Sequence, residues 1–570
     1  MKGKKFNILA WLMIAVFTVG IVGNCSLTAY AAEKRDFIAT HGMVAAAHPL
    51  AAQAGVEVLK QGGNAFDAAI ATAFMLNVVE PNASGMGGGG FAIVYVAKEK
   101  KTYMVDYREM APAKAAPDMY ALDEKGKVKD NASVTGYYAS AVPGMLRGME
   151  MIHQKFATLK WAELMAPAIA QAEAGLPVSK NLSGIIGDQM SRLEKYSPSR
   201  EWFHNIYFKD GIPLQAGDVL RNPELTESLK KVAAGGADVF YKGEIADKLA
   251  AYYAKNANGW ITKADLAAYK AKLREPVKSS YRGYDLVTVP TPSSGGLTLA
   301  NILNIMENFD VAKMGRTSTA FHHTFIEAQK LAYADRGRYM ADSDFVNVPM
   351  AGLVSKKYAA ERAKMISPDT ANNGIKPGDP GKYESGSTTS FSIIDKDGNM
   401  ITITQTINDF LGACVVPDGT GILMNDEMDD FVTNNPASVN APAPGKRPLS
   451  SMSPTIVLKD GKPFMTLGTP GGPRIITTVS QIIIDVIDFK MDLQTAINDP
   501  RMYNPNASVA QLEKPIDEAT VNELMGWGHK VNLRPELSLY FGGAQGIMIL
   551  PDGRLHGAAD PRRLGQAFGY

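Results

Sequence analysis

The sequence predicts a mixed α+β protein, with helical and β-rich segments in different parts of the chain. Residues 140–275 carry apolar side chains at three- and four-residue spacing, in runs such as WAELMAPAIAQAEAG and EIADKLAAYYAKN, as amphipathic helices do. Thr262 to Asp265 resembles a capping box at a helix start, and Gly62-Gly63-Asn64 separates two further helical patterns in residues 41–80. Residues 391–407 instead hold two β-rich runs, SFSIID and MITITQTI, around an Asp397-Gly398 turn. A hydrophobic content of 46% over 570 residues supports a substantial core.

The amino-terminal residues have the pattern of an export signal. Three lysines among the first five residues precede an apolar run over residues 6–22, and Ala29-Tyr30-Ala31 offers small residues where signal peptidase cleaves. We expect residues 1–31 to be removed and the mature protein to be periplasmic or secreted. An uncleaved membrane anchor is the alternative. No later stretch is long and apolar enough to span a bilayer.

Composition excludes several classes of function. Three of the 59 basic side chains and none of the 58 acidic ones lie in residues 1–31, so 56 basic and 58 acidic side chains remain, a net charge of −2. This balance gives no reason to expect a nucleic-acid partner. Cys25 leaves with the signal and Cys414 stays alone, which excludes an intrachain disulfide and a cysteine metal site. The adjacent His322 and His323 lie in a helical pattern and point in different directions, so they do not suit one metal ion.

Two glycine-rich segments need an interpretation. Residues 85–90 (GMGGGG) match the form G-x-G-x-x-G, but the strand-like run follows them at 91–96, so we reject a dinucleotide site and expect close backbone approach. Gly471 and Gly472 precede a helix expected over 475–489, where backbone N–H groups can face an anion. A P-loop requires Lys-Ser or Lys-Thr after its glycines, and neither pair follows here. An oxyanion hole for acyl transfer fits this turn, and packing alone is the alternative.

Charged residues gather at two further places. Arg108 follows the short strand-like run YMVDY and is expected at its exposed end. Residues 421–431 place Glu427, Asp429 and Asp430 close together, before a proline- and asparagine-rich loop over 432–449. The residue pattern alone assigns no ligand to either group.

The segment around Thr388 presents a candidate nucleophile. Residues 367–387 hold several prolines and glycines and no apolar period, which is typical of a long exposed loop. The chain then changes at once into a strand that begins Thr388-Thr389. A cut before Thr388 would leave an amino-terminal threonine, and such a residue can act as a nucleophile.

The hairpin that follows favours one register. An odd loop separates a mostly apolar face from a mostly polar one, with Phe391 opposite Gln405. Thr388 is then opposite Asn408 and diagonal to Thr406. The polar face would form a wall of an active site. An edge hairpin with a solvated face is the alternative.

These motifs together resemble the gamma-glutamyltranspeptidase family of amino-terminal nucleophile hydrolases. The resemblance extends from about residue 41 to the carboxyl end. It implies a four-layer αββα sandwich, made jointly by two subunits from one precursor that cuts itself between Ser387 and Thr388. The large subunit would be residues 32–387 and the small catalytic subunit residues 388–570. The matching segments are Arg108-Glu109-x-Ala111-Pro112, Thr388-Thr389-x-Phe391-Ser392, Asp395-x-Asp397-Gly398-Asn399, Gly421-Ile422-Leu423 to Asp430-Phe431, Lys446-Arg447-Pro448-Leu449-Ser450-Ser451-Met452 and Gly468-x-Pro470-Gly471-Gly472.

The resemblance also implies a role for each site residue and requires no cofactor or metal. Thr388 would be the nucleophile, its freed α-amine the base, and Thr406 its hydrogen-bond partner. The Gly471 and Gly472 amides would stabilise the oxyanion. The remaining residues would bind the γ-glutamyl group: Arg108, Ser450 and Ser451 its α-carboxylate, and Asn408, Glu427 and Asp430 its α-ammonium.

The expected donors are glutathione and related γ-glutamyl compounds, and the expected acceptors are water and amino acid or peptide amines. Residues 431–449 resemble the shorter loops of the family, which lack a lid, so poly-γ-glutamate is a further candidate donor. A polyglutamate depolymerase, a cephalosporin or glutaryl acylase of the same fold, and an uncleaved exported binding protein are the alternatives. Ser390, where many members have histidine, and the segment 411–414 depart from the family pattern.

Overall fold

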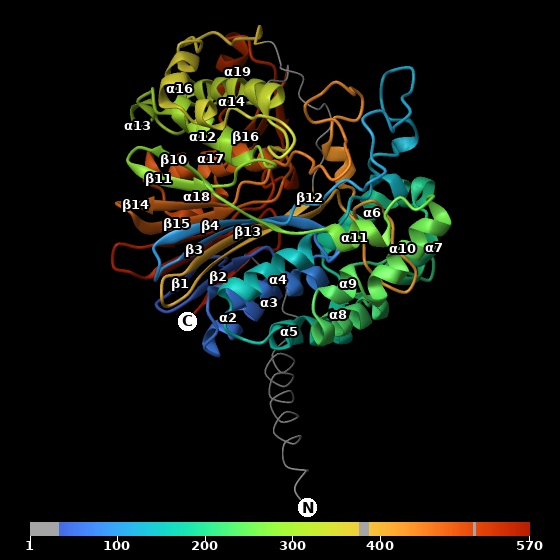
Figure 1. Cartoon of the computed structure of the whole chain (residues 1–570). Coiled ribbons are helices and arrows are strands. Elements are labelled where there is room, and N and C mark those ends of the chain that lie inside the picture. The colour runs from blue at the N-terminus through green and yellow to red at the C-terminus, as the bar shows by residue number, and fades with distance from the viewer. Residues whose placement is uncertain (1–33, 376–386, 506–508) are drawn as a thin grey trace, which may run out of the picture.

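Two seven-stranded sheets face each other in the computed structural model, and helices cover both outer faces (Figure 1). The structure describes residues 34–375, 387–505 and 509–570. The expected four-layer αββα arrangement is therefore confirmed. The predicted signal peptide and residues 376–386 of the predicted loop lie outside the described residues.

The sheet that carries Thr388 has the order β21-β2-β12-β13-β3-β4-β9, with every neighbouring pair antiparallel. Strands from the two parts of the chain are neighbours in it, because β12 pairs with β2 on one side and β13 pairs with β3 on the other. Its strands are β2 (Met43–Ala46), β3 (Gly89–Val96), β4 (Lys101–Asp106), β9 (Lys272–Arg274), β12 (Ser387–Ile394), β13 (Met400–Asn408) and β21 (Gln566–Gly569).

The second sheet has the order β1-β20-β19-β15-β14-β11-β10 and is antiparallel throughout. It too mixes strands from both sides of residue 388, so neither part of the chain could complete a sheet alone. Its strands are β1 (Phe37–Ala39), β10 (Val277–Tyr281), β11 (Tyr284–Thr288), β14 (Thr455–Lys459), β15 (Lys462–Gly468), β19 (Gln545–Ile549) and β20 (Leu555–Ala559).

One helical layer packs on the β12 sheet and the other on the second sheet. In the first layer, Asn64 forms a capping box with Asp67 at the start of α3, which confirms the predicted break at Gly62-Gly63-Asn64. Every residue of α3 is buried, because alanines let it lie close to β12 and β13. The first layer contains α2 (Pro49–Lys60), α3 (Ala65–Val79) and α4 (Met145–Phe156), and the second contains α12 (Gly295–Met306), α14 (Thr319–Tyr339) and α17 (Arg474–Ile487).

The predicted helical region 140–275 is largely confirmed, and Thr262 forms the expected capping box with Asp265. No helix of the described residues combines the length and hydropathy that crossing a membrane requires. The other helices are α5 (Trp161–Ala174), α6 (Lys180–Tyr196), α7 (Arg200–Tyr207), α8 (Pro223–Gly235), α9 (Asp238–Tyr241), α10 (Glu244–Asn256), α11 (Lys263–Ala268), α13 (Val311–Met314), α15 (Met350–Leu353), α16 (Lys356–Ala363), α18 (Leu493–Asn498) and α19 (Glu518–Gly526). Small sheets contain β5 (Leu176–Pro177), β6 (Phe208–Lys209), β7 (Ile212–Pro213), β8 (Val219–Leu220), β16 (Met502–Tyr503), β17 (Ala510–Glu513) and β18 (Val531–Arg534), and the 3₁₀ helices are η1 (Lys129–Asn131), η2 (Tyr137–Ala139), η3 (Glu427–Asp430) and η4 (Leu539–Phe541).

The β12–β13 hairpin has the odd loop that the apolar pattern favours, but the predicted register is wrong by two residues. Phe391 pairs with Ile403, and Thr388 is directly opposite Thr406 rather than Asn408. The reason is the loop itself: the Asp395 amide donates to the Asn399 carbonyl, which closes the hairpin around a tip with Gly398 at a φ of +81°. A bulge between Ser387 and Thr388 then brings Ser387 opposite Asn408.

The alternative of an edge hairpin with a solvated face is wrong. β12 and β13 lie at the centre of their sheet, and every residue of β13 is buried. Their polar face looks into the space between the two sheets, where the Ser392 hydroxyl donates to the Gln545 carbonyl of β19 at 3.4 Å. Ser390, one of the departures from the family pattern, is fully buried and donates to the Ile403 carbonyl at 3.0 Å.

Candidate active site

The Thr388 hydroxyl lies at the start of β12 and faces the Thr406 hydroxyl of β13 across 3.4 Å. Thr406 Oγ1 also accepts from the Asn408 amide at 2.8 Å, which orients the Thr406 hydroxyl. Both threonines are buried. The expected pairing of nucleophile and supporting hydroxyl is therefore present in the geometry, through direct rather than diagonal opposition.

The glycines at 87–90 let β3 and the preceding turn pass close to this pair of strands. A Cβ on Gly88 would lie 1.9 Å from the Thr406 carbonyl oxygen, and one on Gly87 would lie 2.0 Å from the Leu423 carbonyl oxygen. Only glycine can occupy such positions. The strand β3 follows these glycines, as predicted, whereas a dinucleotide site needs a strand before them.

Arg108 is almost completely buried, so its predicted place at an exposed strand end is wrong. Residues 431–449 fold over the end of β4, and Arg108 Nε donates to the Pro448 carbonyl at 3.2 Å. The guanidinium forms ion pairs with Glu427 and Asp430, the two acids expected to receive a substrate ammonium. The groups expected to bind opposite ends of an amino acid are thus paired with each other.

The charges around Arg108 are unbalanced. One guanidinium faces three carboxylates, because Glu109 also lies 3.6 Å from it. Burial raises the pKa values of Glu109 and Glu427, and Arg108 lowers them in part. For Arg108 itself burial lowers the pKa, but Glu427, Asp430 and Glu109 outweigh it and the net shift is upward. A further positive charge in the pocket would lower these raised pKa values and so favour the ionised forms of the two acids.

The hydrogen-bond acceptors of Glu427 and Asn408 also favour the binding of a positively charged group. Neither carboxylate oxygen of Glu427 accepts a hydrogen bond from the described residues, although Oε2 lies in an ion pair with Arg108. Asn408 donates its side-chain amide to the Asp426 carbonyl at 3.1 Å, which leaves its Oδ1 as an acceptor on the same wall. Buried acceptors without donors are uncommon in folded proteins, and here Glu427 Oε1 and Oε2 belong to a residue of the pocket and can receive a donor group of a ligand.

Ser450 and Ser451 complete the opposite wall, and a side chain that the sequence did not indicate supports them. The Ser450 carbonyl accepts from the Ser294 hydroxyl at 2.6 Å. Arg336 of α14 donates to the Ser294 hydroxyl at 2.7 Å and to the Ser451 hydroxyl at 3.1 Å. Arg336 is buried in α14, far from Ser450 and Ser451 in the chain. Its charge on an otherwise buried helix face was the one sequence signal that could have identified it.

The turn between β15 and α17 holds Gly471 and Gly472 at φ values of 133° and 56°. Their carbonyls accept the first hydrogen bonds of the helical turn, from Arg474 and Ile475. A Cβ on Gly471 would lie 3.1 Å from Gly542 Cα, so the turn is packed tightly against the next loop. The predicted glycine turn before a helix is confirmed.

One small pocket brings these residues together. It contains all six residues expected to bind substrate, together with Thr388, Thr406 and Gly472; Gly471 is adjacent in the chain but does not line it. The lining residues are Arg108, Thr388, Thr406, Asn408, Glu427, Asp430, Ser450, Ser451, Met452, Gly472 and Ile475.

Cys414 and a histidine cluster are two other groups with reactive side chains. Cys414 is buried, and burial raises its pKa to about 12, so its thiol is unsuited to act as a nucleophile. His323 and His529 lie with Glu327 in one buried cluster, but the two rings hydrogen-bond to each other at 2.7 Å and Glu327 is paired with Lys330. These groups satisfy one another without a cation.

Two facing sheets between helical layers, with a threonine at the start of a central strand, define the class of amino-terminal nucleophile hydrolases. Within that class, the chain belongs to the gamma-glutamyltranspeptidase family, whose model matches residues 51–570.

Known relatives agree with this assignment over almost the whole chain. The glutathione hydrolase proenzyme of Escherichia coli strain K12 is 41% identical and covers 98% of each chain. The acylase ACY 1 proenzyme of Pseudomonas sp. strain SE83 is 40% identical and covers 93% of this chain and 94% of its own length. Among solved structures, a cephalosporin acylase from Bacillus halodurans has a TM-score of 0.85 at 31% identity, over 96% of this chain and 99% of that one.

Proposed function

We propose that the protein is a glutathione hydrolase and γ-glutamyltransferase in which Thr388 is the nucleophile. The observation that carries this proposal is the pocket in which the Thr388 hydroxyl shares one cavity with the buried Arg108 guanidinium, the buried Glu427 carboxylate and the half-buried Asp430 carboxylate. A γ-glutamyl group has a free α-carboxylate and a free α-ammonium, and this set of charges complements both.

We propose further that the chain matures by cutting itself. The Thr388 hydroxyl would attack the Ser387 carbonyl, and water would hydrolyse the resulting ester. This leaves a carboxylate on Ser387 and an amine on Thr388. The products would be residues 32–387 and 388–570, which stay together because each sheet contains strands from both. An export signal over residues 1–31 would direct the precursor to the periplasm or outside the cell.

Acylation would follow the same chemistry on the substrate. The Thr388 α-amine takes the hydroxyl proton while Oγ1 attacks the γ-carbonyl carbon. The Gly471 and Gly472 amides stabilise the oxyanion, and Thr406 hydrogen-bonds the nucleophile. Collapse of the intermediate breaks the C–N bond, and the proton passes to the leaving amine. Water or an acceptor amine then attacks the ester and regenerates Thr388.

Binding would exchange the internal ion pairs for substrate contacts. The α-carboxylate would replace Asp430 or Glu427 at Arg108 and accept from Ser450 and Ser451. The α-ammonium would in turn bind the released acids and Asn408 Oδ1. This exchange keeps every buried charge compensated, so the desolvation of the acids is offset when the donor enters.

A cephalosporin or glutaryl acylase is the second candidate function, because an acylase proenzyme and an acylase structure are among the relatives. A glutaryl group lacks the α-ammonium. Glu427 and Asp430 both line the pocket, and Glu427 has unused acceptor capacity, which favours a γ-glutamyl donor.

The test compares two chromogenic donors that differ only at this position. We expect γ-glutamyl-p-nitroanilide to be hydrolysed with a kcat/KM about 10- to 10²-fold above that of glutaryl-p-nitroanilide, since a missing charged hydrogen-bond partner costs about 1.5–3 kcal/mol. Equal rates would assign the protein to the acylases. Activity of a Thr388→Ala variant on either donor would refute the proposed nucleophile.

A further inference from the structure

The main-chain carbonyl of Thr388 is held by a side chain that the family resemblance did not indicate. Arg563 Nη1 donates to the Thr388 carbonyl oxygen at 2.6 Å. Glu80, at the end of α3, lies 4.0 Å from Arg563 Nη1 and accepts from the Thr389 hydroxyl at 2.5 Å. An arginine and a glutamate thus hold the first two threonines of β12. Neither lines the pocket that contains Arg108.

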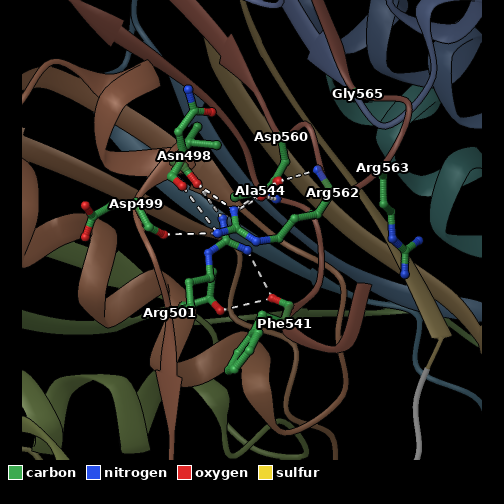
Figure 2. Close-up of polar contacts among 12 residues, drawn as sticks. Asn498, Asp499, Arg501, Phe541, Ala544, Asp560, Arg562, Arg563 and Gly565 are labelled. Atoms are coloured by element: carbon green, nitrogen blue, oxygen red, sulfur yellow. Dashed lines mark hydrogen bonds and ion pairs between the residues drawn. The ribbon is translucent and has the colours of Figure 1, made fainter. Parts of the chain in front are cut away.

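The backbone around Arg563 is fixed by a separate cluster of buried charges (Figure 2). Asp560 accepts from Arg501 at 2.5 Å and from the Ala544 amide at 2.7 Å. Arg562 is paired with Glu513 and Asp560. In Figure 2 the Arg563 side chain extends away from this cluster. The cluster therefore fixes the backbone at Arg562 and Arg563. Of these two residues, Arg563 is the one whose side chain reaches Thr388.

A second anchor holds the far side of the turn. Arg35 Nη1 donates to the Arg563 carbonyl at 3.2 Å and to the Gly565 carbonyl at 2.8 Å. A guanidinium on a backbone fixed from both sides loses little further conformational freedom when it binds the Thr388 carbonyl. Arg563 is thus preorganised for this contact.

Burial makes the Arg563 charge effective. Its side chain is 4% exposed, and its Nε has no hydrogen-bond partner among the described residues. Burial lowers the pKa of Arg563, and Glu80 and Asp560 partly counter this effect. The charged groups nearest to Thr388 are Arg108, Glu427 and Asp430 in the pocket and Arg563 and Glu80 beside the backbone, while Arg474 and Asp560 influence Arg563.

We propose that Arg563 is a positioning residue of the reaction, which orients the Thr388 backbone and keeps the amine released by cleavage in its neutral, basic form. This inference depends on the proposed function, in which that amine is the base. The carbonyl oxygen and the amine nitrogen belong to one residue, so the guanidinium lies within roughly 6 Å of the amine. A buried cation at that distance disfavours a second positive charge, and the amine can then accept the Thr388 proton near neutral pH.

The experiment compares Arg563→Lys and Arg563→Gln with the wild-type protein. Only one nitrogen of Arg563 contacts Thr388, so a lysine ammonium can reproduce the charge and the single hydrogen bond, whereas glutamine is neutral. Cleavage is followed by denaturing electrophoresis, and kcat/KM per cut molecule is measured from pH 5 to 10. Arg316→Met is the matched control, because it removes another arginine, with a side chain only 9% exposed, that is paired with Asp485 on the other helical layer.

We expect Arg563→Gln to move the acidic limb of kcat/KM upward by about one pH unit, which lowers the rate at pH 7 by up to about tenfold and leaves it near wild type at pH 9.5. Arg563→Lys and Arg316→Met should keep the wild-type pH profile. If Arg563→Gln is not cleaved but Arg563→Lys is cleaved, this difference equally establishes that a positive charge is required at position 563. The inference is overturned if the glutamine profile coincides with wild type, or if lysine is no better than glutamine.

A parallel Thr388→Ala sample separates this inference from the proposed function. Activity in Thr388→Ala would refute the proposed function itself. An inactive Thr388→Ala together with a wild-type profile for Arg563→Gln would refute only the role of Arg563.

Discussion

Arg108 and Asp430 are 322 residues apart in the chain and form a partly buried ion pair in the pocket that also holds Thr388. Each is expected to bind the opposite end of the same substrate. Their pairing compensates charges that would otherwise be costly in this cavity, so a substitution that removes one partner leaves the other without its counter-charge.

Replacement of Arg108 tests the carboxylate site. Arg108→Ala should still permit cleavage, because the substrate takes no part in it, but should lower kcat/KM for γ-glutamyl-p-nitroanilide by roughly 10² or more. Arg108→Lys should restore charge without the two-pronged geometry and recover only part of the activity. Because Glu427 and Asp430 lose their partner, thermal unfolding of Arg108→Ala should also occur at lower temperature. Wild-type kinetics would show that the carboxylate binds elsewhere.

Maturation predicts two polypeptides in denaturing electrophoresis. Scaling 61.3 kDa over 570 residues gives about 38 kDa for residues 32–387 and about 20 kDa for residues 388–570. Thr388→Ala should stay uncut, because the backbone shift needs the hydroxyl, whereas Thr388→Ser should retain some processing. An uncut protein that hydrolyses the donor would exclude the amine as base.

Arg336 should affect binding more than chemistry. Arg336→Met removes the hydrogen-bond donors to Ser294 and Ser451. The Ser451 hydroxyl then loses its orientation toward the α-carboxylate of the γ-glutamyl substrate. We expect KM to rise about tenfold with a smaller change in kcat, as loss of one positioned hydrogen bond implies. Ser294→Ala is the comparison, because it removes one contact of Arg336 and the bond to the Ser450 carbonyl but keeps the bond from Arg336 to Ser451. A fall in kcat alone would contradict this role.

Acid stability should depend on His48. Burial lowers its pKa from 6.5 to about 4, and its neutral Nδ1 accepts the Leu50 amide at the start of α2. Between these pH values the unfolded chain binds a proton that the folded chain excludes. The free energy of unfolding should therefore fall as pH falls from about 6.5 to about 4, by at most ~3 kcal/mol from this residue.

His48→Asn provides the matched comparison, since asparagine caps a helix without titrating. Urea unfolding of both proteins at pH 7 and pH 4.5 gives the difference. We expect the variant to lose less stability on acidification, and an equal loss in both proteins would exclude His48 as a contributor.

The loop over residues 431–449 leads to a prediction about donor size. Its prolines and asparagines give little apolar surface with which to close over the donor, so the acyl-enzyme should be open to water and to long donors. We expect substantial hydrolysis beside transfer, and acceptance of γ-glutamyl oligomers. Competition at pH 7.5 to 9 between glutathione and oligomers, with and without glycylglycine, measures both. Exclusion of oligomers while glutathione turns over would show that another element covers the site.

Local patterns determined much of the molecule from the sequence alone. The break before α3, the hairpin after Thr388 and the glycine turn before α17 each depend on residues close together in the chain, whose backbone preferences are expressed wherever they lie. The order of motifs was enough to indicate the family and the members of the pocket.

Tertiary structure alone decided what depends on distant partners. The register of β12 was set by how Asp395 closes its loop, and Arg108 became buried because residues 431–449 fold over it. Arg336 and Arg563 reach the site from a helix and from the carboxyl-terminal turn. No spacing in the chain indicates such contacts, because burial and the strength of a charge are properties of the packed interior rather than of neighbouring residues.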